Sequence, residues 1–483
     1  MLLLPLAGAL LVALLPTRDA RLLQRAALAA ALLVFAYALR LLFLFDAADV
    51  GMQFAEVHAW HARMGASFAL GVDGISLPMI VLAAALMPVS IISAAGMRSN
   101  VRLFFVLLLV LEAAMFGVFV ARDWSLFYVF WELTLIPLFF LIGRVGDNVR
   151  PRRQQAALNF VLYTMGGSVF MLVAILLLYD AVPTHSFSMS AIAAAAPALP
   201  ASAQTWIFLG LFVGFAVKMP VFPVHGWLPL AHVEAPSPVS ILLSGILLKM
   251  GSYGLLRAIE TLPGAALGLS GWLMALALIS IVYGGVLAWR QRDLKAMIAY
   301  SSVSHMGVVL LGLAALNPAG LTGAVYQMVA HGLVAGALFL LVGLLYERTH
   351  TRDIGDYSSL VRSMPRFAFF MVLTLTAAVG LPGTAGFIAE LHVLVGGFAR
   401  WGGWVAILSL GVLVGAAYAF RTIGRLFTGP VEERMKSVPD LTRGEMAAAG
   451  ALALGIVALG LFPAPALALM GASVARVARL FGS

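Results

Sequence analysis

Residues 211–229 read LFVGFAVKMPVFPVHGWLP, an apolar run that is interrupted by Lys218, by Pro220 and Pro223 and by a histidine. A charged side chain near the centre of a bilayer costs roughly 2.5–3.5 kcal/mol on insertion scales. A proline removes a backbone hydrogen bond from a membrane helix, and the freed groups are tolerated only where they face protein or water. The stretch therefore predicts a membrane helix that is broken beside a buried charge. The break is expected to admit water and to expose carbonyls next to Lys218.

The rest of the chain has the composition of a membrane protein. Its 483 residues are 62% hydrophobic and 11% charged, whereas soluble domains are about 25% charged. Charge clusters and Pro/Gly punctuation divide it into about fourteen apolar runs, each near the ~20 residues that cross the hydrocarbon core as a helix. We predict an all-α polytopic membrane protein with about fourteen transmembrane helices, at 1–16, 26–45, 76–96, 103–121, 124–142, 157–179, 205–230, 237–258, 264–288, 297–316, 321–346, 367–398, 403–424 and 445–470.

The positive charges are unevenly distributed between the two sets of loops. The loops after odd-numbered runs hold most of the Lys and Arg, whereas the other set holds only Arg63, Arg122, Arg257 and Arg400. Basic loops stay on the cytoplasmic side. This predicts a multi-pass protein of a bacterial inner membrane with both termini on the periplasmic side. The net charge of +9 is then a topology signal, with phospholipid headgroups as the contact and no nucleic acid as partner.

Several kinds of chemistry have no support in the sequence. The chain has no cysteine, so it offers no thiolate ligand to an iron–sulfur cluster or to zinc, and no disulfide. It has no glycine-rich phosphate loop after a strand and no paired-histidine spacing such as H-x-x-x-H. We therefore expect this chain to bind no cofactor and no metal, so any electron transfer takes place elsewhere.

Ionisable residues recur inside the apolar runs. Lys218 and Lys249 lie within such runs, whereas Lys295 follows a basic loop and is expected to reach the membrane interface, and Lys436 lies in a polar loop. The acidic and histidine residues in or beside apolar runs are Glu112, Glu132, Glu390, His225, His232, His305, His331 and His392. Each has an ordinary alternative: a buried Glu can be protonated and hydrogen-bonded, and a buried His can simply pack.

Taken together, these residues indicate a proton path. Burial and neighbouring charges bring buried Lys and Glu groups toward proton exchange near neutral pH. A path across a membrane needs such groups, or water, within hydrogen-bond reach of one another. The proton-path candidates are Glu132, Lys218, Lys249 and Glu390, with Glu112, His305, His331 and His225 as secondary candidates.

A possible internal repeat relates two parts of the chain. KMPVFP in run seven and GLPGTAG in run twelve are both breaks beside an ionisable residue, as in the paired broken helices of transporters. Charged residues align at a shift of about 172 residues, whereas the prolines align at about 162, so the register stays open. We predict two inverted five-helix repeats, runs 4–8 and 9–13, with broken helices 7 and 12. The corresponding segments are 1–102 (helices 1–3), 103–260, 261–428 and 429–483 (a loop and helix 14).

Four longer stretches resemble a known family. They are FPVHGWLPLAHVEAPSPVSILLSGILLKMGSYGLLR at 222–257, WRQRDLKAMIAYSSVSHMG at 289–307, FYVFWELTLIPLFFLIG at 127–143 and GLPGTAGFIAEL at 380–391. They are similar to the antiporter-like membrane subunits of respiratory complex I, which are related to Mrp-type antiporter subunits. The likeness is greatest to the M type, or chain 4, because Glu390 stands where the L and N types usually have lysine.

The resemblance implies a mechanism. Glu132 pairs with Lys218, Lys249 lies at the centre of a buried axis, Glu390 ends it, and His305 and His331 support hydrated connections. The chain would be a non-redox, proton-translocating subunit of an NADH:quinone oxidoreductase, beside L-like and N-like subunits. NADH, FMN, Fe–S clusters and quinone would be bound by other subunits.

Two positions depart from the family pattern. Leu230 replaces the aspartate of the usual W-L-P-D-A-H motif, and Asn159 stands where many members have lysine. These departures leave room for related functions: an Mrp-type cation/proton antiporter subunit, or the membrane arm of an energy-converting hydrogenase or of a CO2-uptake complex.

Overall fold

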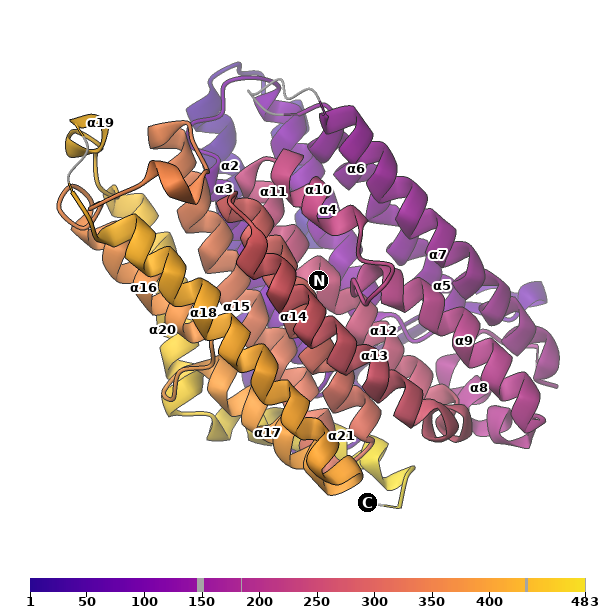
Figure 1. The fold of residues 1–483 in the computed structure, drawn as a ribbon. Helices are drawn as coiled ribbons and strands as arrows, with labels where there is room; N and C mark the ends of the chain where they lie inside the picture. The colour runs from indigo at the N-terminus through magenta and orange to yellow at the C-terminus, as the bar shows by residue number, and fades with distance from the viewer. Residues whose placement is uncertain (146–151, 184, 431–432, 483) are drawn as a thin grey trace.

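A computed structural model describes residues 1–145, 152–183, 185–430 and 433–482, which form a bundle of long helices running roughly side by side (Figure 1). In this described part, 12 helices are long and apolar enough to cross a membrane. One of these spans, Ala385–Phe427, contains two successive helices, and the shorter apolar helices include Leu3–Leu14 and Pro365–Ala378. The predicted class, a helical polytopic membrane protein, is confirmed.

The membrane helices follow the predicted runs closely. The N-terminal segment and the first predicted unit contain α1 (Leu3–Leu14), α2 (Ala20–Leu44), α3 (Ser76–Ser93), α4 (Val101–Val120), α5 (Trp124–Leu133), α6 (Leu135–Gly143), α7 (Arg153–Ala181), α8 (Met189–Ala195), α9 (Ala201–Lys218), α10 (Trp227–Glu234), α11 (Ser237–Leu242) and α12 (Leu248–Thr261). The remainder contains α13 (Pro263–Arg290), α14 (Leu294–Ala315), α15 (Pro318–Thr349), α16 (Pro365–Ala378), α17 (Ala385–Trp401), α18 (Ile407–Phe427), α19 (Glu433–Lys436), α20 (Arg443–Leu461) and α21 (Ala464–Arg479).

A β-hairpin between α2 and α3 was not predicted. Strand β1 (Gln53–His61) pairs antiparallel with β2 (Ala66–Val72), and β1 is exposed along almost its whole length. Residues 56–59 of β1, EVHA, alternate polar and apolar side chains, which is the strand period. Gly65, with φ of 60°, occupies the left-handed conformation in the turn. This short alternation is a strand signal, and a division of the chain by apolar runs does not detect it.

The two predicted helix breaks are confirmed. α9 ends at Lys218 and α10 begins at Trp227, so the break spans KMPVFP and the residues after it. α16 ends at Ala378 and α17 begins at Ala385, around the GLPGTAG stretch. Prolines lack the backbone N–H that would continue each helix, which explains why both breaks follow the sequence signal.

The same backbone bridge occurs near the start of each predicted unit. Asp123 pairs with Ser188, and Asp293 pairs with Asp353, each as an isolated antiparallel bridge. In both cases the residue after the Asp donates its N–H to the chain opposite and the residue before it accepts: Trp124 N to Phe187 O and Met189 N to Arg122 O, then Leu294 N to Arg352 O and Ile354 N to Arg292 O. Both Asp side chains also cap the helix that follows. The same bridge therefore recurs at a shift of about 170 residues along the chain.

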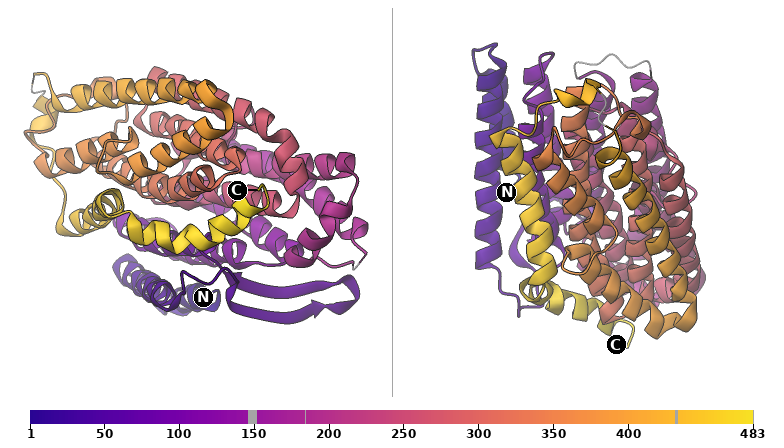
Figure 2. Two further views of the ribbon diagram at one scale, coloured as in Figure 1. Left: turned by 90° about the horizontal axis from the view of Figure 1, so that it is seen from below. Right: turned by 60° about the vertical axis from the view of Figure 1, so that its left-hand side comes forward.

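The C-terminal region differs from the prediction. Run fourteen was expected to continue to residue 470, but α20 ends at Leu461 and a separate helix, α21, begins at Ala464 after Pro463. The C-terminal helices, yellow in Figure 2, lie next to the N-terminal segment, and Gly74 N donates to Ser473 Oγ at 2.9 Å. A proline at the first turn of a helix starts a new one more readily than it continues the old one.

A buried ion cluster joins three of these elements. The Nη2 of Arg257 donates to both oxygens of Asp73, at 2.7 and 2.8 Å, and Arg122 and Arg476 lie at 3.4 and 3.3 Å from the same carboxylate. Burial alone would raise the pKa of Asp73, but Arg257 and Arg122 hold it well below its ordinary value. The cluster therefore ties the start of α3 to the end of α12 and to α21.

Candidate functional site

The most enclosed membrane helices carry the central candidate residues. The share of the apolar window that is buried is 100% for Ser237–Thr261, 94% for Pro318–Thr349 and 89% for Leu294–Ala315. These three spans contain Lys249, His331 and His305 respectively. Ionisable side chains in such positions face the interior of a bundle and mark functional sites more often than structural ones.

Lys249 is held by one backbone carbonyl and one imidazole. Its Nζ donates to Ser244 O at 2.5 Å and lies 2.6 Å from Nδ1 of His331. The carbonyl belongs to a π-helical turn, Leu243–Leu247, that joins α11 to α12. Such turns alter the regular backbone bonding and occur often at functional sites. The Ser244 hydroxyl lies 2.9 Å from that of Ser302, which connects this turn to α14.

From Lys249, ionisable side chains continue toward Glu390. The rings of His331 and His305 have centroids 5.3 Å apart, and Nδ1 of His305 lies 3.7 Å from Oε1 of Glu390. A cavity of about 20 Å³ beside His305 and Glu390 is also lined by Tyr418, and is large enough for about one water molecule. Lys249, His331, His305 and Glu390 therefore form a continuous succession, here called the buried axis.

The break between α16 and α17 makes room for Glu390. Gly380 lies in this break with φ of 79°, and a Cβ added there would lie 2.7 Å from Oε2 of Glu390. The left-handed backbone conformation favours glycine, and a side chain here would push the carboxylate of Glu390 aside. The second broken helix thus places an acidic group at the end of the buried axis.

Lys218 lies in a different environment, at the first broken helix. It is the last residue of α9 and is 1% exposed, and its Nζ donates to Thr134 Oγ1 at 3.0 Å. The ammonium also lies 4.9 Å from the centre of the Trp131 ring. The sequence predicts that exposed carbonyls of its own helix stabilise the Lys218 ammonium, but the described residues show no such contact. The carbonyls of Phe215, Ala216 and Val217 accept instead from Met219 N, Val221 N and Trp227 Nε1.

The expected Glu132–Lys218 ion pair is open. Among the residues that the structure describes, no carboxylate oxygen lies within 4.0 Å of the Lys218 ammonium. Oε1 of Glu132 is buried and has no hydrogen-bond partner in this described part of the chain. Glu132 also lines an open, apolar groove of about 680 Å³ between α5, α6 and α7. The two side chains are near each other in the fold without being in contact.

Two secondary candidates stand apart from the buried axis. Glu112 is fully buried in α4, and neither carboxylate oxygen has a partner within the described ranges. His225 lies in the first break among aromatic rings, 5.3 Å from Tyr283 and 6.1 Å from Phe222 between centroids. His392, also named from the sequence, has its Nδ1 2.7 Å from Ile388 O in its own helix. None of these three contacts the buried axis directly.

His232 is a further buried imidazole, in α10. It is fully buried in α10 and stacks on Phe339 at 4.4 Å between ring centroids. Neither ring nitrogen has a hydrogen-bond partner among the described residues. An unpaired buried imidazole is costly, so His232 belongs with the candidates for proton exchange.

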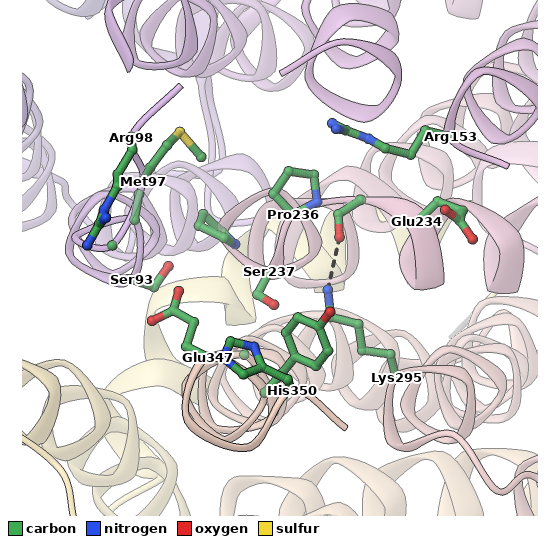
Figure 3. Close-up of a pocket in the computed structure, with 16 residues that line it drawn as sticks. Ser93, Met97, Arg98, Arg153, Glu234, Pro236, Ser237, Lys295, Glu347 and His350 are labelled. Carbon is green, nitrogen blue, oxygen red and sulfur yellow. Dashed lines mark hydrogen bonds between the residues drawn. The ribbon is translucent and has the colours of Figure 1, made fainter. Parts of the chain in front are cut away.

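A polar pocket of about 570 Å³ lies close to His232 along the chain (Figure 3). Its labelled residues include Arg98, Arg153, Glu234, Lys295 and Glu347, which come from the ends of several helices. Lys295 was expected at the membrane interface; it is 1% exposed, and its Nζ donates to Ala235 O at 2.9 Å. The pocket therefore brings polar groups from the basic loops to the side of the bundle next to α10.

Sequence reasoning missed the neutral partners of the two lysines. Ser244 and Thr134 are ordinary residues in apolar runs, and nothing in the sequence marks the π-helical turn. Thr134 did have a signal: Pro137 frees the carbonyl four residues earlier and so predicts a break near 133–134, where α5 ends and α6 begins. For metals, no group of three or more His, Cys, Asp or Glu is placed to hold an ion in the described ranges.

The fold and the buried axis together define the class: a polytopic membrane protein with ionisable groups enclosed at helix breaks, as in proteins that move ions or protons. Residues 121–415 match the family described as NADH:quinone oxidoreductase/Mrp antiporter, transmembrane. The chain belongs to this family, and the resemblance noted in the sequence is confirmed.

Relatives and solved structures agree with this assignment. The chain is 43% identical to NADH-quinone oxidoreductase subunit M of Rhodobacter capsulatus, over 93% of this chain and 89% of that protein. A chain of respiratory complex I from Thermus thermophilus with bound NADH superposes with a TM-score of 0.91 at 33% identity, covering 100% of this chain and 99% of that one. A chain of the Mrp complex from Dietzia sp. DQ12-45-1b gives 0.86 at 23% identity over 99% and 96%, which shows a shared fold.

Proposed function

We propose that this chain is the M-type, non-redox subunit of a proton-translocating NADH:quinone oxidoreductase. The observation that carries the proposal is the buried axis, in which Lys249, His331, His305 and Glu390 follow one another across three enclosed helices and the second broken helix. In this proposal the chain lies in a bacterial inner membrane with both termini on the periplasmic side, next to L-like and N-like subunits. NADH, FMN, Fe–S clusters and quinone belong to other subunits of that complex.

Proton transfer starts at Lys249. A charged lysine donates a hydrogen bond, and a neutral His331 accepts it at Nδ1, 2.6 Å away. Movement of that proton onto Nδ1 leaves a neutral amine, which keeps its bond to Ser244 O. The imidazolium of His331 then passes a proton to His305, and the small cavity lined by His305 and Glu390 has room for one water that relays it to the carboxylate.

Lys249 regains its proton from the side of the basic loops. The pocket of Figure 3 includes residues of these loops, and His232 lies in α10 two residues before Glu234, which lines the pocket. His232 has free ring nitrogens among the described residues, so it can accept a proton from water and donate one. This route uses a titratable group or a water at each step, as a membrane proton path requires.

The Glu132–Lys218 pair acts as the gate. Two unit charges about 4 Å apart interact by about 4 kcal/mol at an effective dielectric constant of 20. Opening or closing this pair changes the field felt by Lys249 on the adjacent helix, since α9 and α12 pack closely at Gly251 and Gly254. Quinone reduction elsewhere in the complex would drive the change, and Lys218 gates rather than carries the proton.

The test is Lys249→Met in the intact complex reconstituted into liposomes. NADH-driven acidification or alkalinisation of the lumen is expected to be abolished, because methionine cannot bind a proton. Lys436→Met is the matched control, since Lys436 is exposed in α19 and, among the residues that the structure describes, pairs with Glu433. Full proton pumping by Lys249→Met would overturn the proposal. Sodium-dependent antiport in the absence of NADH would favour the Mrp-type alternative.

A further inference from the structure

The Lys218 ammonium occupies a defined place that is not an ion pair. Its Nζ is 3.0 Å from Thr134 Oγ1, 4.9 Å from the centre of the Trp131 ring and 6.0 Å from that of Phe160. An ammonium within about 6 Å of an aromatic face is attracted by the ring quadrupole, most strongly by tryptophan. The lysine thus has a hydrogen-bond acceptor and an aromatic face on the helix that also carries Glu132.

The hinge between α5 and α6 presents this acceptor. Pro137 has no N–H, so the carbonyl of Leu133 loses its helical partner and the helix is interrupted at Thr134. The Thr134 hydroxyl donates to Trp131 O at 2.8 Å. Because its one hydrogen is used there, its oxygen lone pairs remain for the ammonium. Thr134 is fully buried and Trp131 is 1% exposed, so water is kept from replacing either contact.

The end of α9 offers Lys218 no equivalent place. The carbonyls of its last turn already accept from Met219 N, Val221 N and Trp227 Nε1. A lysine that leaves Glu132 without a replacement would be an unpaired charge in a low-dielectric interior, which is strongly unfavourable. A neutral acceptor and an aromatic face, each within two residues of Glu132, stabilise the ammonium when it has left the carboxylate.

We propose that Thr134 and Trp131 form a second position for the Lys218 ammonium, which holds the lysine in place while its pair with Glu132 is open. The inference rests on the proposed function, in which that pair is the gate. The gate then has two discrete positions on one helix, Glu132 and the Thr134–Trp131 position, and the lysine moves between them by side-chain rotation. Two defined positions make the gate bistable, as a switch requires.

Thr134→Val in the intact complex tests the proposal. Valine keeps the shape of the side chain and removes the hydrogen-bond acceptor. The ratio of the open to the closed Glu132–Lys218 pair is therefore expected to fall about tenfold or more, which is the effect of losing a hydrogen bond to a charged group. A cryo-EM structure of the variant complex should then place Nζ of Lys218 within ion-pair distance of Glu132. Proton pumping per NADH oxidised should fall with it, whereas Thr134→Ser, which restores a hydroxyl, should recover both.

A matched control and a double variant separate this role from general packing. Thr374→Val removes another buried hydroxyl, whose hydrogen bond in the described part of the chain is to Phe370 O in its own helix, and it should leave pumping unchanged. If Thr134 acts by competing with Glu132 for the lysine, Thr134→Val should add little to Glu132→Gln. Trp131→Phe, with a weaker aromatic face, should give an intermediate shift.

The outcomes are distinct from those of the proposed function. Loss of pumping in Lys249→Met together with unchanged pumping and an unmoved Lys218 in Thr134→Val would overturn this inference and leave the proposed function standing. Additive losses in the double variant would also overturn it. Full pumping by Lys249→Met would remove the function on which the inference rests.

Discussion

The two broken helices use the same backbone device for opposite charges. In the first, Lys218 is the last residue before the break, and its ammonium contacts a hydroxyl and an aromatic ring. In the second, Glu390 lies in the helix after the break, and its carboxylate contacts His305 and approaches Gly380. In the described residues the first charge has Glu132 near it without an ion pair, whereas the second contacts His305 at the end of the buried axis.

This difference separates gating from transfer. A group that passes protons needs another titratable group or a water close by, and Glu390 has both His305 and a one-water cavity. A group that only changes the local field needs two stable positions and no proton acceptor, which fits Lys218 with Glu132 and Thr134. The two breaks are therefore alike in backbone, but their side chains have different roles: gating at the first break and proton transfer at the second.

The largest expected effect is that of breaking the buried axis at His331. His331→Leu removes the partner 2.6 Å from Lys249 and the link to His305. Proton translocation by the reconstituted complex should fall by about 10²-fold or more, the usual contribution of a positioned acid or base. His225→Leu, in the first break, should reduce it less than about tenfold, because the ring contacts of His225 in the described residues are with aromatic side chains and not with the buried axis. Equal losses of proton translocation in His331→Leu and His225→Leu would contradict the assignment of proton transfer to the buried axis and of gating to the first break.

The two capping aspartates offer an intermediate test of the repeat. Asp123 is fully buried and accepts from Ser67, Ser125 and Leu126, whereas the more exposed Asp293 caps Lys295 and Ala296 and pairs with Arg352. Asp123→Ala should lower the free energy of unfolding by about 2 kcal/mol and Asp293→Ala by about 1 kcal/mol.

Thermal unfolding of the purified complex carrying each variant measures this difference. Asp49→Ala serves as the control, since Asp49 is exposed and accepts only a local bond from Gly51 N; its effect should stay within about 0.5 kcal/mol. If Asp293→Ala lowered the free energy of unfolding more than Asp123→Ala does, burial would not explain the relative contributions of the two aspartates.

The smallest expected effect concerns the glycine at the second break. Gly380→Ala places a Cβ 2.7 Å from Glu390 and forces alanine to a φ of 79°. The variant should lose about 1 kcal/mol of stability and show a partial loss of pumping. Gly268→Ala, in α13 with nothing within 4 Å of the added Cβ, should be neutral or stabilising by the same thermal measurement. A neutral Gly380→Ala would mean that Glu390 can move away freely.

Much of the fold was predictable because its signals are local. Apolar runs of membrane length, the basic loops and the prolines at 220 and 382 each act within one helix, and the structure has helices and breaks at these places. The repeated Arg-Asp dipeptides at 122–123 and 292–293 are a local signal that the sequence analysis did not use. The hairpin and the end of α20 were missed because strand alternation and a single proline are weaker signals than hydropathy.

The candidate site was predictable in its members and not in its contacts. Buried Lys, Glu and His residues stand out in an apolar sequence because each is costly there. The open state of the Glu132–Lys218 pair, and the roles of Thr134, Ser244 and His232, depend on which faces of different helices meet. Neutral hydroxyls and carbonyls carry no such cost, so hydropathy does not mark them; for Thr134 the available signal was the helix break that Pro137 predicts.

The sequence by itself determined that this chain crosses a membrane many times, is broken at two proline-containing helices and buries charges at those breaks, because hydropathy and proline chemistry act along the chain. The tertiary structure alone decided that Lys249 meets His331 while Lys218 rests on Thr134 and Trp131. Those contacts join residues on helices far apart in sequence, and close packing of side chains sets the rotation and depth at which the helices meet.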